Sequence, residues 1–283
     1  MKLNSRVLVA TDFSVGADEA LREGARLAAQ AEGPLGVVHV LPPLGPNAVR
    51  PRDVVGRLTR AIRERLRRVD AREDSEIFVD EGTDYEQIVH RGAQWHAELI
   101  VVGARSPAPL GHMFRGVGER VVRDAHCPVL VARPGHGQGG VLAATDLTKP
   151  SLPAVVAGAE EADRRGTRLR VVHAVGFLDM EARYLLSQGS SNDAGDSDFA
   201  GLEEKLEDAV ARLGIDPTCL ILDGPATRAI IGKAKAIDAE LVVVATRAKT
   251  AGVRAVLRSV AEDVVRSAPC SVLVVRSPVA GAS

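Results

Sequence analysis

The chain is poor in aromatic residues, in cysteine and in net charge. Aromatic side chains make up 3% of its 283 residues while hydrophobic residues make up 46%. The core must therefore be aliphatic, which is typical of parallel strands covered by helices. Three cysteines, with no CxxC or Cys/His finger spacing, argue against a disulfide framework and give no zinc motif. A formal charge of −1 gives no electrostatic case for binding nucleic acid.

Long hydrophobic runs are missing as well. No run approaches membrane-spanning length and residues 1–6 form no apolar signal segment, so we expect a cytoplasmic protein without a membrane partner. The sequence also contains no nucleophile elbow, Walker lysine motif, His-Glu metal helix or paired carboxylates. Those patterns accompany nucleophilic, phosphate-transferring and metal-dependent catalysis. The sequence therefore gives little support for an enzyme.

What the chain does contain is a repeat of domain length. The segment VLVATDFS at residues 7–14 returns as VLAATDLT at 141–148, and AHCPVLVAR at 125–133 returns as APCSVLVVR at 268–276. A period of this size is too long for a solenoid unit and suits a whole domain. The sequence predicts two copies of one module.

The two modules are expected at residues 1–134 and 140–277, joined by a linker at 134–140 that is too rich in glycine to join either sheet. In the first copy, short β-branched runs alternate with helical patterns, which predicts an α/β fold with two Rossmann-like, doubly wound domains in the whole chain. Strands are expected near 7–10, 37–40, 77–79, 99–103 and 128–132, and helices near 14–32, 52–72, 85–96 and 117–125.

The second copy repeats this order with one enlarged connection. It is longer by eight residues between its second and third strands, around 176–200. The run SQGSSNDAGDSD at 187–198 is acidic and rich in small residues, so we expect a mobile loop there.

In a doubly wound sheet, ligands bind beyond the carboxyl ends of the strands, where the strand order reverses. This rule draws attention to Thr11-Asp12, His39-Val40, Gly82 and the loop after Gly103. These residues, together with the Ala-x-Cys-[Pro/Ser]-Val-Leu-Val end of each copy, resemble the universal stress protein family. The resemblance covers nearly all of both copies, and the chain looks like a tandem member.

The resemblance implies a five-stranded parallel sheet in the order 3-2-1-4-5, with the fifth strands of the two copies paired, and a homodimer. Many members bind ATP or AMP through a Gly-x2-Gly-x9-Gly-[Ser/Thr] loop after the fourth strand, with the Asp after the first strand nearby. Glycines let backbone N–H groups approach phosphate, and a helix N-terminus favours the anion. ATP, with Mg²⁺, or AMP is therefore expected in the first copy. The expected contacts are Thr11, Asp12, Val40, Gly82, Val102, Gly103, Arg105, Ser106, Gly116, Val117 and Gly118.

Both copies depart from that loop. Read forward from the fourth strand, the first copy keeps Gly103 and Gly116 but has Ser106 and Val117 at the other two positions; read backward from the next helix, the terminal pair is Arg115-Gly116. The second copy has no glycine there, only Ala245, Ala248 and Arg258-Ser259. A Cβ at each of these positions crowds a phosphate. We therefore expect that the second copy does not bind a nucleotide.

Two other functions stay open. One is a ligand-free interaction scaffold, in which both loops have decayed. The other is a slow ATPase in which Asp12 positions metal and phosphate, against which the absent glycines and lysine weigh.

Several candidate residues also have simpler structural interpretations. Asp12 and Asp146 are as well suited to capping the following helix as to a ligand, and Ser14 is a cap rather than a nucleophile. His39 and His173 are expected to close strand ends through backbone hydrogen bonds. Cys127 and Cys270 are expected to be small buried residues, with a redox pair as the alternative. Trp95 is expected to pack; His112 and Arg115 face water or an anion.

The helix near 52–72 is rich in arginine, whereas its counterpart carries Glu203, Glu204, Glu207 and Asp208. We interpret the arginines as a solvated face. The opposite charges favour electrostatic docking between subunits as the alternative, which a salt-insensitive oligomer would contradict.

Overall fold

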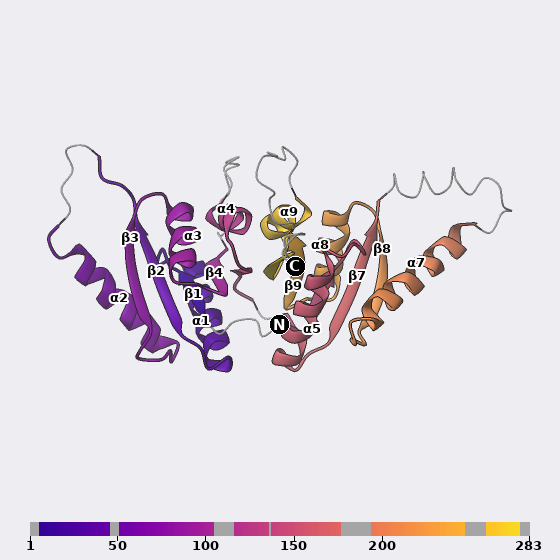
Figure 1. The fold of residues 1–283 in the computed structure, drawn as a ribbon, viewed down its shortest axis with the longest axis horizontal. Helices are drawn as coiled ribbons and strands as arrows, with labels where there is room; N and C mark the ends of the chain where they lie inside the picture. The colour runs from indigo at the N-terminus through magenta and orange to yellow at the C-terminus, as the bar shows by residue number, and fades with distance from the viewer. Residues whose placement is uncertain are drawn as a thin grey trace. The chain divides into compact units, whose positions relative to one another are not determined.

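The structure, a computed structural model, describes residues 6–45, 51–104, 116–135, 137–176, 194–246 and 259–277. The chain divides into two compact units, Met1–Pro134 and Gly135–Ser283, each an α/β fold (Figure 1). Within the described ranges, none of the helices has the length and apolar character that crossing a membrane requires. Six residues of the predicted loops lie outside the described residues: Arg105, Ser106, His112, Arg115, Ala248 and Arg258.

The first unit is a five-stranded parallel sheet with helices on both faces. Its pairings give the order β3-β2-β1-β4-β5, as expected from the resemblance. Helices α1 and α2 pack together on one face, and α3 and α4 pack together on the other. The elements are β1 (Val7–Ala10), α1 (Val15–Gln30), β2 (Leu35–Leu41), α2 (Val54–Arg68), β3 (Glu76–Glu81), α3 (Asp84–Gln94), β4 (Leu99–Gly103), α4 (Val117–Asp124) and β5 (Val129–Ala132).

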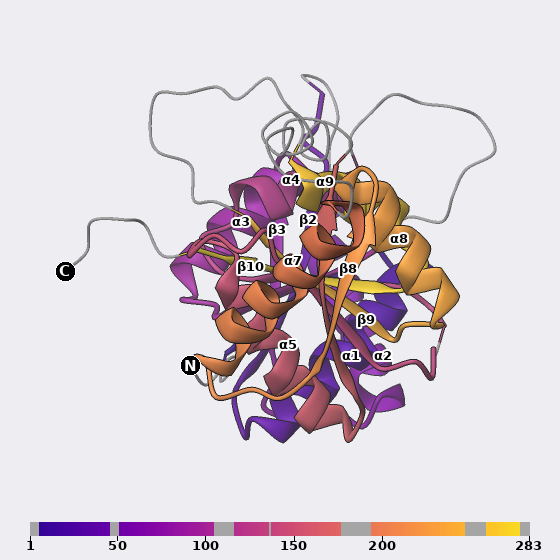
Figure 2. The same cartoon turned by 90° about the vertical axis from the view of Figure 1, so that its right-hand side faces the viewer.

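The second unit repeats this topology, with parallel pairings in the order β8-β7-β6-β9-β10. Figure 2 turns this unit toward the viewer, with α7 and β8 in front. Its elements are β6 (Val141–Ala144), α5 (Leu152–Arg165), β7 (Leu169–Val175), α7 (Ala194–Ala211), β8 (Thr218–Asp223), α8 (Ala226–Ala236), β9 (Leu241–Thr246), α9 (Val260–Ser267) and β10 (Ser271–Arg276).

One expectation about the second unit was wrong. The acidic run was predicted to be a loop as far as residue 198, but α7 begins at Ala194. The last residues of the run therefore continue the backbone of α7. The rest of the predicted loop, 177–193, lies outside the described residues.

The cores are aliphatic, as the composition indicates. Val7, Leu8 and Val9 of β1 and Val141 and Leu142 of β6 are 0% exposed. These strands read as continuous apolar runs because they carry neighbours on both edges and helices on both faces. Burying each such side chain stabilises the fold by about 1.5–3 kcal/mol.

The packing role predicted for Trp95 is confirmed. It is the C-cap of α3 and only 8% exposed. Its indole Nε1–H donates to Glu76 Oε1 at 2.8 Å, and its ring meets Phe78 edge-on at 6.0 Å between centroids. Since the chain has a single tryptophan, its fluorescence reports on the first unit alone.

The glycine-rich linker is not flexible along its whole length. Gly139 N–H donates to Asp238 O at 2.9 Å, and Gly140 O accepts from Glu240 N–H at 2.9 Å. A Cβ on Gly139 would lie 1.6 Å from Ile237 O. Glycines stand here because two backbones of the second unit approach closely. The described residues of the linker join neither sheet, as predicted.

Candidate functional site

The carboxyl ends of β2, β1 and β4 lie side by side, with β1 in the middle. The chain leaves β1 toward β2 and later returns to β4 on the other side, so the strand order reverses between β1 and β4. This edge brings together Thr11-Asp12, Val40 and Val102-Gly103. Gly82 follows β3, one strand further out, where its N–H donates to Leu41 O at 2.9 Å.

The histidine near the end of β2 is a structural residue, as predicted. His39 Nδ1 lies 2.7 Å from Thr11 O, and His173 Nδ1 lies 3.0 Å from Thr145 O in the second unit. Each ring ties the end of one strand to the loop that follows its neighbour. Within the described part of the chain, no cluster of three or more His, Cys, Asp or Glu side chains is arranged to hold a metal ion.

Asp12 is exposed, and its Oδ1 accepts the Ser14 N–H at 2.9 Å. Ser14 itself is the N-cap of α1, accepting Ala17 N–H at 3.2 Å. The interpretation of Ser14 as a cap is confirmed, whereas that of Asp12 as the cap of this helix was wrong. Among the described residues nothing bonds to Asp12 Oδ2, so this oxygen can accept a ligand hydroxyl or bind a cation. Asp146 makes the matching turn, accepting Thr148 N–H at 3.0 Å.

Gly103 is glycine for a reason that the sequence reasoning missed. A Cβ on Gly103 would lie 2.3 Å from the carbonyl carbon of Gly16, and a Cβ on Gly16 would lie 2.3 Å from Ala104 O. The end of β4 therefore touches the first turn of α1 through backbone atoms, which only a glycine pair permits. This is a packing requirement, independent of phosphate.

The second copy has lost both members of this pair. Ala245 stands at the position of Gly103, and the 134-residue repeat places Pro150 at the position of Gly16. In keeping with this, α5 begins at Leu152, three positions later than the repeat of α1 would. The loss of both glycines in the second copy was the feature of the sequence that could have indicated this packing role. Ala245 by itself is therefore no evidence that the second unit has lost a ligand site.

The start of α4 distinguishes the copies more directly. Gly116 is its N-cap and makes no side-chain cap, and no atom of the described residues lies within 4 Å of the place where a Cβ would stand. In α9 the matching Ser259 hydroxyl accepts Glu262 N–H at 3.2 Å. A Cβ on Gly118 would lie 3.5 Å from the Val102 side chain, so the uncapped turn lies over the end of β4.

Comparison with known proteins then decides the family. The model of the universal stress protein family matches the chain twice, over residues 4–133 and 140–276. The chain belongs to the universal stress protein family. The universal stress protein Rv2623 of Mycobacterium tuberculosis is 26% identical over 298 residues, covering 95% of this chain and 96% of that protein.

Solved structures share the fold of this tandem universal stress protein. A universal stress protein from Archaeoglobus fulgidus superposes with a TM-score of 0.64 at 19% identity, covering 98% of each chain. A protein of unknown function from Pseudomonas aeruginosa gives a TM-score of 0.63 at 21% identity, over 96% of this chain and 92% of that one.

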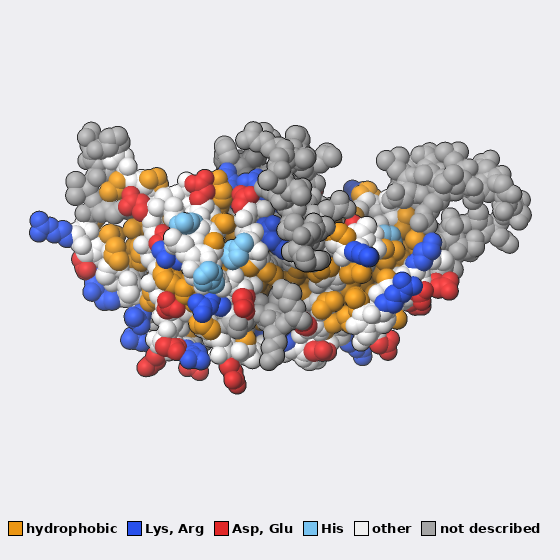
Figure 3. Space-filling view, in the orientation of Figure 1, with side chains coloured by type: hydrophobic (Ala, Val, Ile, Leu, Met, Phe, Trp, Pro, Cys, Tyr) orange, Lys and Arg blue, Asp and Glu red, His pale blue; other side chains and the backbone are white. Residues whose placement is uncertain are grey.

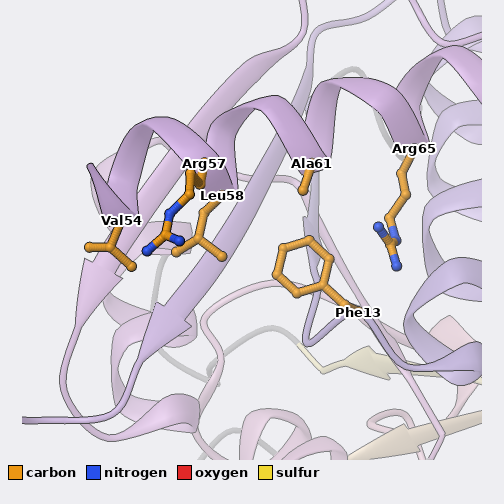
Figure 4. Close-up of a pocket in the computed structure, with 6 residues that line it drawn as sticks. All are labelled: Phe13, Val54, Arg57, Leu58, Ala61 and Arg65. Carbon is orange, nitrogen blue, oxygen red and sulfur yellow. The ribbon is translucent and has the colours of Figure 1, made fainter. Parts of the chain in front are cut away.

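A hollow of about 430 Å³ lies beside this edge in the first unit of the universal stress protein, between α2 and the β1–α1 loop (Figure 4). Side chains of α2 form one wall and the Phe13 ring forms the other. None of its lining residues is an expected nucleotide contact. They are Phe13, Val54, Arg57, Leu58, Ala61 and Arg65.

The solvated face of α2 is confirmed. Ile62 and Leu66 are buried, while five arginines of this helix are exposed: Arg57, Arg60, Arg63, Arg67 and Arg68. Acidic and basic side chains are interspersed over the face seen in Figure 3, which accords with the formal charge of −1.

All three cysteines are buried, which confirms the prediction for Cys127 and Cys270. Burial raises the pKa of the Cys219 thiol, and the carboxylates of Glu207, Glu203 and Asp216 raise it further. The unfolded chain therefore loses this proton at lower pH than the folded chain, so stability is complete below the ordinary thiol pKa of about 8.5 and falls above it. We expect urea unfolding of the second unit to show this loss as the pH rises above about 8.5, and Cys219→Ala to reduce the slope. An unchanged slope in that variant would contradict the assignment.

Proposed function

We propose that this tandem universal stress protein is a regulatory binding module whose first unit binds an adenine nucleotide, ATP or AMP. The observation that carries the proposal is the contrast between α4 and α9. The α4 N-terminus has no side-chain cap at Gly116, whereas Ser259 occupies the matching place in α9 with its own hydroxyl. The N–H groups in the first turn of α4 therefore have no hydroxyl of their own N-cap to bind, and a phosphate could accept hydrogen bonds from them.

The remaining parts of the proposed site fit the same ligand. Asp12 supplies an oxygen that could accept a ribose hydroxyl, or contribute to Mg²⁺ when ATP brings the ion. Val40 is half-buried at the end of β2 and offers an apolar surface to the base. The proposed contacts Arg105 and Ser106 belong to the loop outside the described residues.

In this proposal the nucleotide acts through stability and partner choice rather than turnover. A ligand that binds only the folded state stabilises it by about 2.7 kcal/mol at a hundredfold excess over its Kd. The second unit, with its site filled by its own serine, contributes structure to the assembly. We place the protein in the cytoplasm as a homodimer.

A thermal shift experiment tests the proposal. We expect ATP or AMP at millimolar concentration to raise the midpoint of the transition followed by Trp95 fluorescence, since that probe lies in the unit proposed to bind. The absence of any shift with ATP, ADP and AMP would favour the ligand-free scaffold instead.

A pair of reciprocal variants locates the site without disturbing the fold. Gly116→Ser gives α4 the cap that α9 has, and the exchange between glycine and serine at an N-cap changes stability by only a few tenths of a kcal/mol. We expect this variant to lose most of the nucleotide-induced shift, because the serine hydroxyl occupies the N–H groups. Ser259→Gly in the second unit is the matched control and should leave the shift of Trp95 unchanged. A full shift in Gly116→Ser would place the nucleotide elsewhere.

A further inference from the structure

The hollow under α2 is not required by the fold. Along α2 the apolar side chains become less buried toward its start: Leu66 is 5% and Ile62 0% exposed, but Leu58 and Val54 are only half-buried. The corresponding stripe of α7 is closed, because Leu202, Leu206 and Val210 are 4%, 0% and 1% exposed. Leu202 is therefore fully packed in the second unit, whereas Leu58 at the matching position of the first unit borders an apolar opening.

The opposite wall is an aromatic ring held in a fixed place. Phe13 has a left-handed backbone, φ 64°, and its N–H donates to Thr11 Oγ1 at 3.2 Å. Its ring lies 4.8 Å from that of His39. The repeat has the same turn at Leu147, φ 63°, so the turn belongs to the fold while the aromatic surface belongs to the first unit.

The charge around the hollow is positive. Arg65 lies over the Phe13 ring at 4.8 Å and is paired with Asp18 at 3.0 Å. Arg57 stands at the other end of the hollow (Figure 4), is exposed, and pairs with no carboxylate among the described residues. None of the described lining residues is acidic. An apolar floor with arginine at its ends is complementary to an apolar chain with an anionic head.

We infer that this hollow binds a small anionic amphiphile, a medium-length acyl chain ending in a carboxylate. The chain would lie against Phe13, Leu58 and Ala61, and its carboxylate would bind Arg57. The apolar stretch of α2 from Val54 to Ala61 is about 10 Å long at the helical rise, and about 430 Å³ is within the range of small-molecule sites. The inference does not rest on nucleotide binding.

Decanoate is the probe, titrated into the full chain and followed by calorimetry and by the methyl NMR signals of Leu58 and Ala61. We expect saturable binding at one site. Acetate, which has the charge without the chain, should bind at least about tenfold more weakly, since each buried methylene contributes about 0.8 kcal/mol. Decyltrimethylammonium has the chain with the opposite charge and should also bind more weakly. Equal binding of either control, or no saturation with decanoate, would overturn the inference.

Three variants locate the ligand. Ala61→Phe fills the hollow and should weaken decanoate binding at least about tenfold, by the same loss of chain contacts. Arg57→Gln should weaken it about fivefold, the upper effect of an exposed charge pair. Arg63→Gln removes an exposed arginine of α2 that does not line the hollow and should bind as the parent does.

The nucleotide-induced shift of Trp95 should persist in all three variants, which separates this inference from the proposed function. Undiminished binding in both Ala61→Phe and Arg57→Gln would show that decanoate binds elsewhere. Circular dichroism of Ala61→Phe checks its fold, and Arg57→Gln tests the site without changing the volume of the hollow.

Discussion

Replacing Gly103 with valine is expected to unfold much of the first unit. The new Cβ would lie 2.3 Å from Gly16 C and 2.6 Å from Ala17 N, and these are backbone atoms that cannot turn aside. Overpacking against backbone costs about 3 kcal/mol or more, a large fraction of the 5–15 kcal/mol that holds a domain folded. The urea midpoint followed by Trp95 fluorescence should fall sharply.

The repeat supplies the control for this variant. Ala245→Val changes the equivalent end of β9, where the side chain is half-exposed, and should cost less than about 1 kcal/mol. Gly16→Ala should resemble Gly103→Val, since its Cβ would lie 2.3 Å from Ala104 O. The loss of stability in the double variant Gly16→Ala/Gly103→Ala should be smaller than the sum of the losses in the two single variants, because one displacement of α1 relieves both clashes. An unchanged Trp95 midpoint in Gly103→Val would mean that α1 and β4 do not meet as described.

Loss of ligand response in a Gly103 variant would therefore be ambiguous. A bulky residue there removes the fold of the unit along with any nucleotide site. The pair Gly116→Ser and Ser259→Gly separates the two effects, because a Cβ on Gly116 meets no atom of the described part of the chain within 4 Å.

Gly139→Ala is expected to have a comparable effect on the second unit. Its Cβ would lie 1.6 Å from Ile237 O and 2.9 Å from Asp238 O, so the segment would have to leave its place. The Gly139 N–H bond to Asp238 O would be lost with it. We expect a cost of about 3 kcal/mol or more.

The signature of this variant should be a divergence of two probes. The Trp95 midpoint should stay where it is, while the far-UV circular dichroism loses part of its signal at lower urea. Gly232→Ala in α8 is the matched glycine control: a Cβ there has no atom within 4 Å, and alanine in a helix interior should stabilise by about 0.5–1 kcal/mol. A single transition reported equally by both probes would contradict the assignment of Gly139 to the second unit.

The sequence was sufficient for the fold because each signal was local and occurred twice. The buried strands are continuous apolar runs, β4 was predicted with its observed bounds of Leu99–Gly103, and the repeat supported each element of the second unit. The role of Ser14 followed from short-range chemistry, and that of His39 followed from its position at the end of a strand.

The role of individual glycines did not follow, because it depends on distant partners. Gly103 meets Gly16, and Gly139 meets Ile237, contacts between residues far apart along the chain. The family loop gave a ligand explanation for Gly103, and the glycine-rich composition of residues 134–140 gave a linker explanation for Gly139. Neither pattern contains the tertiary contact that explains why the residue is glycine. The opening under α2 could not be predicted from the sequence either, since Leu58 and Leu202 are the same residue type at matched positions.

The glycine pair also constrains how the two halves diverged after duplication. If the ancestral half resembled residues 1–134, alanine could not have arisen at the position of Ala245 while the helix still began against that strand, because its methyl group would have met backbone atoms at 2.3 Å. Retreat of the helix start, now marked by Pro150 and by Leu152 as the first residue of α5, had to come first. Under that premise, the close approach of Gly103 to Gly16 requires the helix start to have moved before alanine arose in the strand.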